Sequence, residues 1–231
     1  FSYLQLKQNK KNEITFKIKL VNSKRNTKVS IEIPELNFKR SFYADQQGMV
    51  KKTIKLTPQL WSPSNPKLYE VNISTNNDFI SDRIGFRHIY TEGKKIFLNG
   101  NPIKFKGISM HAEPIGEVGP AFSKEHFQDL LRTSKDLNVN FVRAAHYPYS
   151  RHLAKVADEM GLLLWEEVPV YWNIDWSNPE TLNIANNQIS RLVERDWNRS
   201  SVGVWSIANE TPFSDERMEF LKNLLETIQL K

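Results

Sequence analysis

Between Glu13 and about Tyr90, apolar and polar residues alternate with a period of two, the repeat that turns one face of a β-strand toward a core. The apolar positions of the three clearest runs are Ile14, Phe16, Ile18 and Leu20; Val29, Ile31 and Ile33; and Val50, Ile54 and Leu56. Turn-forming segments at residues 22–26, 45–48 and 62–66 separate these runs. Short strands at such spacing predict an antiparallel β-sandwich.

The pattern changes after residues 96–105, where Asn99-Gly100 supplies the positive φ angles of a tight hairpin turn. Beyond this hairpin, apolar runs that predict strands alternate with amphipathic segments that predict helices. The predicted strands are 103–109, 139–145, 162–168 and 202–208, and the helices begin at Ser123, Ser150, Pro179 and Ser214. Four strand–helix units with nearly continuous apolar strands predict a parallel sheet covered by helices.

No glycine-rich phosphate-binding loop follows any of these strands, so a barrel is the α/β fold that remains. A closed (β/α)8 TIM barrel needs eight strands and ~250 residues, and the four units amount to half of one. We therefore predict a multi-domain chain. Residues 1–92 form an all-β sandwich, and residues 93–231 form the N-terminal half of an α/β TIM barrel.

The net charge of +6 comes entirely from the predicted sandwich, since residues 1–92 hold 16 Lys and Arg against 8 Asp and Glu. There the basic residues alternate singly with apolar ones, as on a solvated strand face, so we expect no nucleic-acid partner. No apolar run is long enough to span a membrane, and no membrane association is expected. The absence of cysteine leaves the compartment open, with a periplasmic or secreted location slightly favoured over the cytoplasm.

In TIM barrels, functional residues gather at the carboxyl ends of the strands, and all four predicted ends carry polar side chains. In chain order these are His111, then Arg143 and His146, then Glu166 and Glu167, and finally Asn209 and Glu210. Such a cavity suits a polyhydroxylated substrate and carboxylate catalysis, because glycoside hydrolysis uses one carboxyl group as proton donor and a second as nucleophile or base. Asn209 would then bind the sugar hydroxyl beside the anomeric carbon.

Several longer motifs carry a family resemblance. They are Leu60-Trp-Ser-Pro-Ser-Asn-Pro-Lys-Leu-Tyr69, Arg83-Ile-Gly-Phe-Arg87, Leu98-Asn-Gly-Asn-Pro102, Lys106-Gly-Ile-Ser-Met-His111, Asn140-Phe-Val-Arg-Ala-Ala-His-Tyr-Pro148, Arg195-Asp-Trp-Asn-Arg199 and Trp205-Ser-Ile-Ala-Asn-Glu210. Over essentially its whole length the chain resembles glycoside hydrolase family 2, which includes β-galactosidases, β-glucuronidases and β-mannosidases. The resemblance implies an immunoglobulin-like sandwich before the barrel and a retaining mechanism with Glu210 as the acid/base. It also implies that His111 and His146 lie near the bound sugar and that Arg143 orients the catalytic carboxylates.

Simpler structural roles compete with these functional ones. Arg143 can instead form a buried ion pair with Glu166 or Glu167, of which only one can face the barrel interior because they are adjacent. Trp172 and Trp176 either form an aromatic wall over the sugar, the substrate-binding role we assign to Trp172, or cover a small core in their own loop. His111 and His146 can likewise be core histidines, and Trp61 is expected to pack in the core rather than stack on a sugar.

Two departures from the family pattern bear on the chemistry. Metal-dependent β-galactosidases of the family carry a carboxylate and a histidine two residues apart after the third strand, where this chain has Pro169-Val-Tyr-Trp-Asn173. We therefore expect no metal site and no cofactor. The family's nucleophile is a glutamate on the seventh strand, beyond the four predicted here, so we expect the 231 residues alone not to complete turnover and to self-associate through open sheet edges.

The sequence thus predicts part of a retaining β-glycoside hydrolase that acts on terminal β-linked sugars, and we favour the β-galactosidase type. A β-glucuronidase of the same family is the first alternative. A fragment that binds carbohydrate or another partner without catalysis is the alternative from another class. The expected ligand in each enzymatic case is a carbohydrate substrate.

Overall fold

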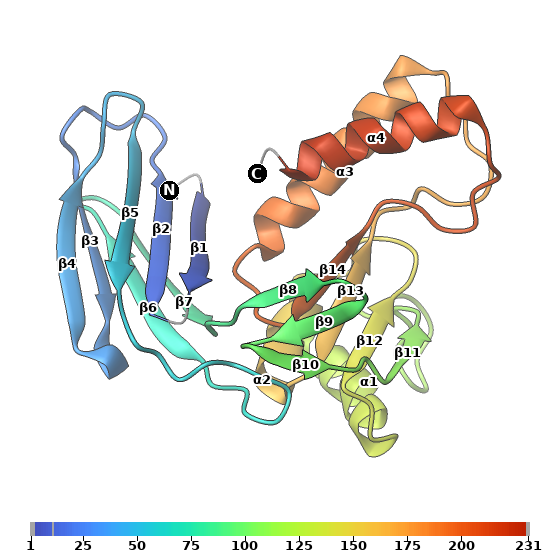
Figure 1. The fold of residues 1–231 in the computed structure, drawn as a ribbon, viewed down its shortest axis with the longest axis horizontal. Helices are drawn as coiled ribbons and strands as arrows, with labels where there is room; N and C mark the ends of the chain where they lie inside the picture. Colours follow the sequence, from blue (N-terminus) through green and yellow to red (C-terminus); the bar gives the residue numbers. More distant parts are fainter. Residues whose placement is uncertain (1–2, 11, 230–231) are drawn as a thin grey trace. The chain divides into compact units, whose positions relative to one another are not determined.

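The computed structural model describes residues 3–10 and 12–229, so the first two and the last two residues of the predicted domains lie outside the described residues. The chain divides into two compact units (Figure 1). Unit 1 runs to Lys104 and also includes Asn198–Ser200, and unit 2 comprises Phe105–Trp197 and the residues from Ser201 onward. Within unit 1, Arg199 forms an ion pair with Asp82, and the Ser200 hydroxyl donates to the Gly85 carbonyl at 3.0 Å.

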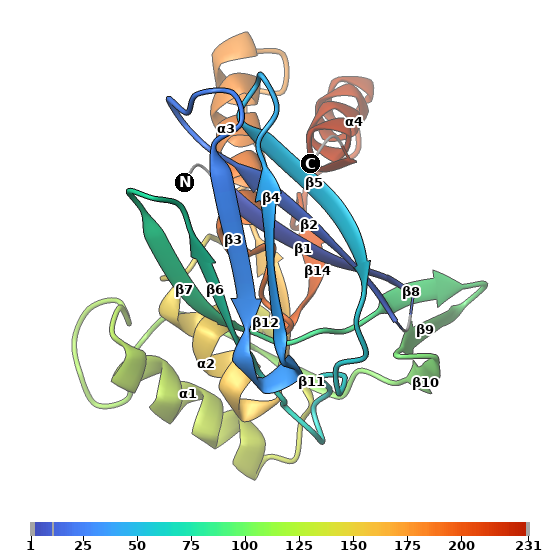
Figure 2. The same cartoon turned by 90° about the vertical axis from the view of Figure 1, so that its left-hand side faces the viewer.

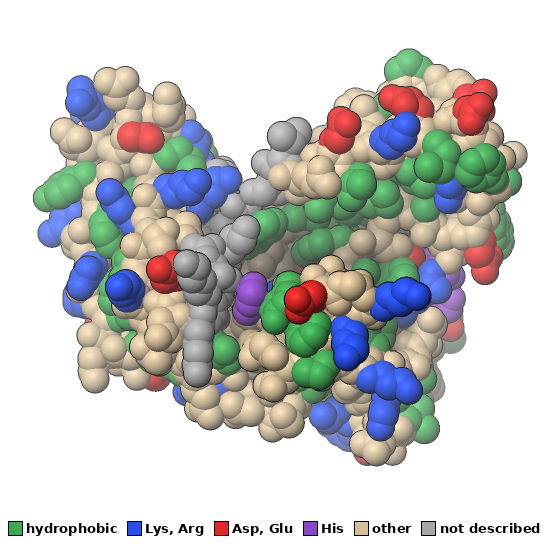
Figure 3. Space-filling view, viewed as in Figure 1, with side chains coloured by type: hydrophobic (Ala, Val, Ile, Leu, Met, Phe, Trp, Pro, Cys, Tyr) green, Lys and Arg blue, Asp and Glu red, His purple; other side chains and the backbone are tan. Residues whose placement is uncertain are grey.

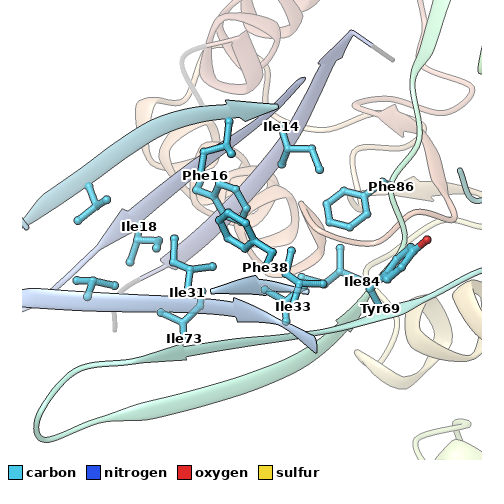
Figure 4. Packing of buried hydrophobic residues seen from close by; sticks show 14 of the residues in the cluster. Ile14, Phe16, Ile18, Ile31, Ile33, Phe38, Tyr69, Ile73, Ile84 and Phe86 are labelled. Carbon is cyan, nitrogen blue, oxygen red and sulfur yellow. The ribbon is translucent and has the colours of Figure 1, made fainter. Parts of the chain in front are cut away.

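Unit 1 contains two antiparallel sheets with the strand orders β1-β2-β5 and β4-β3-β6-β7. The strands are β1 (Tyr3–Lys10), β2 (Glu13–Lys19), β3 (Lys28–Ile33), β4 (Phe38–Tyr43), β5 (Met49–Lys55), β6 (Tyr69–Ser74) and β7 (Phe79–Ile84), with a short 3-10 helix, η1 (Pro34–Leu36). Inward-facing side chains of both sheets form one hydrophobic core (Figure 4). Two antiparallel sheets around a shared core make a β-sandwich.

The period-two pattern of the sequence corresponds to the burial of this core. Ile14, Phe16 and Ile18 of β2 are fully buried, and Phe16 stacks on Phe38 of β4 with ring centroids 5.9 Å apart. Trp61 is also fully buried, which confirms its predicted place in the core. Figure 3 shows that basic side chains are spread singly over the side of unit 1 that faces the viewer.

A third small sheet completes unit 1 in the order β10-β9-β8. Its strands are β8 (Ile89–Glu92), β9 (Lys95–Leu98) and β10 (Asn101–Ile103). The predicted hairpin between β9 and β10 is confirmed, with Asn99 at φ 56° and Gly100 at φ 88°. The predicted domain boundary after residue 92 lies within this sheet, and the strand predicted at 103–109 starts too early, because Ile103 pairs with Ile96 in the hairpin.

Unit 2 is a parallel four-stranded sheet in the order β11-β12-β13-β14, with each connection made through a helix (Figures 1 and 2). The strands are β11 (Gly107–Met110), β12 (Phe141–Ala144), β13 (Leu163–Glu167) and β14 (Val202–Ser206), and the helices are α1 (Lys124–Asp136), α2 (His152–Met160), α3 (Pro179–Asp196) and α4 (Asp215–Gln229). The caps follow the sequence signals, since Ser123 accepts a hydrogen bond from the His126 N–H and Asn178 accepts one from Glu180. Helix α2 begins two residues after the predicted Ser150.

The two faces of this sheet differ in chemistry. Val142 and Ala144 of β12 and Leu164 of β13 pack with buried residues of α1 and α2. The alternate residues point to the opposite face, where the register aligns Arg143 with Trp165. Helices α3 and α4 pack against each other over a second core. The face that carries Arg143 is the one on which the polar side chains of the strand ends gather.

None of the helices in the described part of the chain combines the length and the hydropathy that a membrane span requires.

Candidate active site

The centre of the site is an ion pair between neighbouring strands. Arg143 of β12 binds the Glu167 carboxylate of β13 through two hydrogen bonds, from Nε to Oε1 at 2.9 Å and from Nη2 to Oε2 at 3.0 Å. The Glu167 side chain is only 1% exposed, and the Ser206 hydroxyl of β14 donates to its Oε2 at 2.9 Å. The guanidinium also lies over the Trp165 ring, 5.3 Å from its centroid. A buried carboxylate with this many hydrogen-bond donors is held rigidly in place.

Two predicted ligands of the sugar attach directly to this pair. Arg143 Nη2 donates to Asn209 Oδ1 at 2.6 Å, which leaves the Asn209 amide nitrogen as a donor. His146 Nδ1 lies 3.2 Å from Glu167 Oε1. Nδ1 also lies 3.4 Å from Arg143 Nη2, which can only donate, so the tautomer of the imidazole determines which of the two groups it bonds. The ion pair therefore fixes the hydrogen-bonding polarity of Asn209 and contacts His146 through both of its members.

An aromatic arc continues from His146 along the strand ends. The His111 ring, which is exposed beyond β11, meets His146 edge to face at 5.7 Å and lies 6.2 Å from Tyr147. On the other side of His146, the Tyr171 ring centroid is 6.2 Å away. Adjacent aromatic rings with polar tips are suited to contacts with a sugar ring.

Glu210 and Trp172 lie at the end of this arc, in the loops that follow β14 and β13. Trp172 Nε1 donates to Glu210 Oε2 at 3.1 Å, and both side chains are exposed. Their backbones are joined because Tyr171 and Asn209 form a parallel bridge beyond the ends of the two strands. The bridge places Asn209, which contacts Arg143, immediately before Glu210.

The adjacent glutamate, Glu166, faces away from the site toward the helices. It is fully buried, and burial first and the nearby Asp196 carboxylate second raise the pKa of Glu166 well above its ordinary value. Arg195 lies 4.0 Å from Glu166 Oε1 and binds Asp196 through Nε at 2.7 Å. Glu166 is therefore part of a buried acidic cluster behind the sheet, whereas Glu167 belongs to the site.

The structure brings all six predicted site residues into one chain of contacts. They are His111, Arg143, His146, Trp172, Asn209 and Glu210. Arg143 combines the two roles considered for it, because it pairs with Glu167 and also contacts Asn209. The two tryptophans differ: Trp176 packs against Phe220 in the α3–α4 core, and Trp172 is exposed. The sequence does not predict that Ser206 contacts Glu167, because this contact follows from the pairing of Ser206 with Glu167 between β14 and β13.

Among the residues that the structure describes, no group of three His, Cys, Asp or Glu side chains is arranged to hold a metal ion. The arrangement instead offers one exposed carboxyl group, an amide donor and imidazole nitrogens around a fixed cation. This set can exchange a proton with a bound molecule and hydrogen-bond its hydroxyl groups.

Known proteins share both the sequence and the fold. A β-galactosidase from Thermoanaerobacterium thermosulfurigenes is 30% identical over 215 residues, which are 86% of this chain and 29% of that protein. A β-glucuronidase from Paenibacillus borealis is 30% identical over 187 residues, or 73% of this chain and 31% of that protein. The chain thus spans under a third of the length of these relatives.

Solved structures match almost the whole chain. A GH2 β-galacturonidase from Eisenbergiella tayi bound to galacturonate superimposes with a TM-score of 0.83 at 27% identity, covering 99% of this chain and 43% of that one. A β-glucuronidase from Bacteroides uniformis gives a TM-score of 0.82 at 26% identity, over 100% of this chain and 32% of that one.

Family models account for both units. The model described as "Glycosyl hydrolases family 2" matches residues 2–87, and the one described as "Glycosyl hydrolases family 2, TIM barrel domain" matches residues 89–229. The second match alone covers more than half of the chain. The chain therefore belongs to glycoside hydrolase family 2.

Proposed function

We propose that this chain carries the acid/base side of the active site of a retaining β-glycoside hydrolase, of β-galactosidase type, with Glu210 as the acid/base. The observation that carries the proposal is the position of Glu210. Its carboxyl group is exposed at the carboxyl edge of a parallel sheet, directly after Asn209, which the buried Arg143–Glu167 pair holds. An exposed carboxyl group that directly follows an amide donor held by a fixed cation has the access and the surroundings that proton transfer to a sugar requires.

The neighbouring side chains support binding of a sugar. The free amide nitrogen of Asn209 donates to the hydroxyl beside the anomeric carbon, and this bond strengthens as positive charge develops on the sugar in the transition state. His146 hydrogen-bonds a second hydroxyl through its outer ring nitrogen, and His111 adds a polar edge beside it. The exposed ring of Trp172 provides an apolar face for the sugar.

Retention of configuration requires a second carboxylate as nucleophile, separated from the acid/base by roughly 5–5.5 Å. Glu167 does not fit that role, because its side chain is buried and both of its oxygens accept hydrogen bonds from Arg143 and Ser206 or contact His146. We assign the nucleophile to a glutamate on the seventh strand of the complete barrel, as the family resemblance implies. The same reasoning makes unit 1 an immunoglobulin-like sandwich and unit 2 the first half of that barrel.

A β-glucuronidase or a related uronidase is the second candidate, because two of the solved structures with the same fold act on uronides by name. A module that binds carbohydrate without catalysis is the third. The contacts proposed for Asn209 and His146 use hydroxyl groups that galactosides and uronides share, so we assign the choice of sugar to groups outside this set.

The test is a panel of aryl β-glycosides, with galactoside, glucuronide and galacturonide members, assayed with the complete gene product. We expect one β-glycoside to be hydrolysed with release of the β-anomer first, as followed by NMR at early times. Release of the α-anomer would contradict the retaining mechanism. Hydrolysis of the uronides alone would favour the second candidate, and binding of sugars without hydrolysis of any member would favour the third.

A further inference from the structure

Trp172 touches the functional end of Glu210 itself. Its indole Nε1 donates to Glu210 Oε2 at 3.1 Å, and this is a contact between side chains from two different strand ends. The sequence allows Trp172 to form a wall over the sugar, the role assigned to it, or to cover a small core in its own loop. The structure gives its N–H a specific acceptor within the protein.

The backbone holds the two residues in place independently of that hydrogen bond. The Asn209 N–H donates to the Val170 carbonyl at 2.9 Å, and the Trp172 N–H donates to the Asn209 carbonyl at 3.1 Å, so pairing of the two chains continues past β13 and β14. Trp172 and Glu210 then adopt positive φ angles of 56° and 49°. Residues other than glycine adopt this conformation at an energetic cost, and bulky residues that do so cluster at functional sites.

Packing does not explain the position of Trp172. Its side chain is 64% exposed, and its ring makes an edge contact with Tyr171 at a centroid distance of 5.4 Å. Trp176, four residues later, is the tryptophan of this loop that fills the core, through an edge contact with Phe220 at 5.3 Å. The Trp172 indole is therefore oriented by its hydrogen bond and by Tyr171, with most of its ring open to solvent.

We propose that Trp172 is a positioning residue that fixes which oxygen of Glu210 transfers the proton. The proposal rests on the proposed function, in which Glu210 is the acid/base. Because Oε2 accepts from the indole, the transferable proton resides on Oε1. During bond cleavage Oε1–H gives its proton to the glycosidic oxygen, which keeps the electron pair of the breaking C–O bond, while the nucleophilic carboxylate forms its bond to the anomeric carbon.

The indole then stabilises the product of that proton transfer. Glu210 becomes a carboxylate, and an N–H donor binds an ionised oxygen more strongly than a neutral one. In the second half of the reaction Oε1 takes a proton from the attacking water. Loss of the N–H therefore slows hydrolysis most where the leaving group needs the proton most.

Leaving-group dependence tests this inference, with Trp172→Phe in the complete gene product. Phenylalanine keeps an aromatic ring and removes the donor. For glycosides with poor leaving groups we expect kcat/KM to fall about tenfold, the effect of losing one hydrogen bond to a charged group, and for dinitrophenyl glycosides less than about twofold. Trp176→Phe removes an indole from the same loop without contact to Glu210 and is expected to show no such dependence. An equal loss on all leaving groups would show a simple sugar contact and overturn the inference.

The second arm needs no catalysis and uses the 231-residue chain. Among the indole N–H resonances of the six tryptophans, the one absent from Trp172→Phe is expected to shift when carboxylates are protonated in acid, and to lose that shift in Glu210→Gln. A Trp172 resonance that does not respond in the wild-type chain would overturn the inference. If the phenylalanine variant failed to fold, the wild type would be compared with Glu210→Gln alone, and the inference would be overturned if no indole resonance lost its acid response in that variant. Normal hydrolysis of poor leaving groups by Glu210→Gln would instead overturn the proposed function.

Discussion

Replacement of Arg143 by methionine is expected to destabilise unit 2 strongly, because it leaves a charge buried without its main partner. Glu167 is 1% exposed and has four polar contacts, of which Arg143 supplies two. Breaking a buried ion pair costs about 3–5 kcal/mol. Since Ser206 and His146 remain, and since the Arg143 side chain is 27% exposed, we expect the lower end, about 3 kcal/mol.

A double variant separates the stranded charge from lost packing. In Arg143→Met with Glu167→Gln, the carboxylate is replaced by a neutral amide that can still contact Ser206. We expect this double variant to be more stable than Arg143→Met by at least about 1 kcal/mol, in the manner of a double-mutant cycle. Arg132→Met is the matched control, because Arg132 pairs with Asp129 at 2.7 Å but both side chains are exposed, and we expect a change within about 0.5 kcal/mol.

Urea unfolding followed by tryptophan fluorescence suits this comparison. Trp61 lies in unit 1 and the other five tryptophans lie in unit 2, so the signal mainly reports unit 2. With a urea dependence of ~2 kcal/mol per M, a loss of 3 kcal/mol lowers the midpoint by about 1.5 M. A midpoint for Arg143→Met equal to that of Arg132→Met, or a double variant no more stable than the single one, would refute the argument that a buried charge is left unpaired.

Two further variants test the packing around the site. Burial and the Asp196 carboxylate raise the pKa of Glu166, so protonation of Glu166 stabilises the folded state below the ordinary pKa of 4.5, and this stabilisation is lost as the pH rises. Glu166→Gln should therefore gain stability relative to wild type between about pH 4.5 and neutrality. A difference in the free energy of unfolding that does not depend on pH in urea titrations would contradict this. Gly107→Ala should lower the urea midpoint by the equivalent of about 1–3 kcal/mol, because its Cβ would lie 2.7 Å from the Phe141 carbonyl oxygen, and an unchanged midpoint would show that β11 can move away.

The outermost strands of the parallel sheet predict self-association of the chain. In the sheet that the structure describes, β11 and β14 are the outermost strands. The 231-residue chain is therefore expected to self-associate with increasing concentration in sedimentation velocity, and a single monomeric species across the range would count against it.

The alternation of apolar and polar residues predicts much of the fold, because a half-buried strand and an amphipathic helix impose different periods. The failure at residues 103–109 has a local cause. Ile103 and Phe105 continue the alternation of the hairpin, and the sequence gives no sign that β11 begins only at Gly107, where the strand approaches Phe141 too closely for a side chain. Strand partners, not propensity, determine that boundary.

The polar strand ends also predict where the site lies, but not how its residues connect. From Val202 onward a strict period of two would place Val202, Val204 and Ser206 on one face. The pairing of β14 with β13 instead shifts between Leu164 and Trp165, so Val202 packs with the helices while Ser206 reaches Glu167. The bond from Trp172 to Glu210 depends in the same way on two left-handed backbone conformations that the sequence does not predict.

The most direct test of the central claim is chemical rescue of Glu210→Ala in the complete gene product. If Glu210 is the acid/base, the variant should lose about 100-fold or more in kcat/KM on phenyl glycosides, much less on dinitrophenyl glycosides, and added azide should restore turnover with formation of the β-glycosyl azide. Equal losses on both substrates without any azide product, or activity equal to that of the wild type, would contradict the assignment of Glu210.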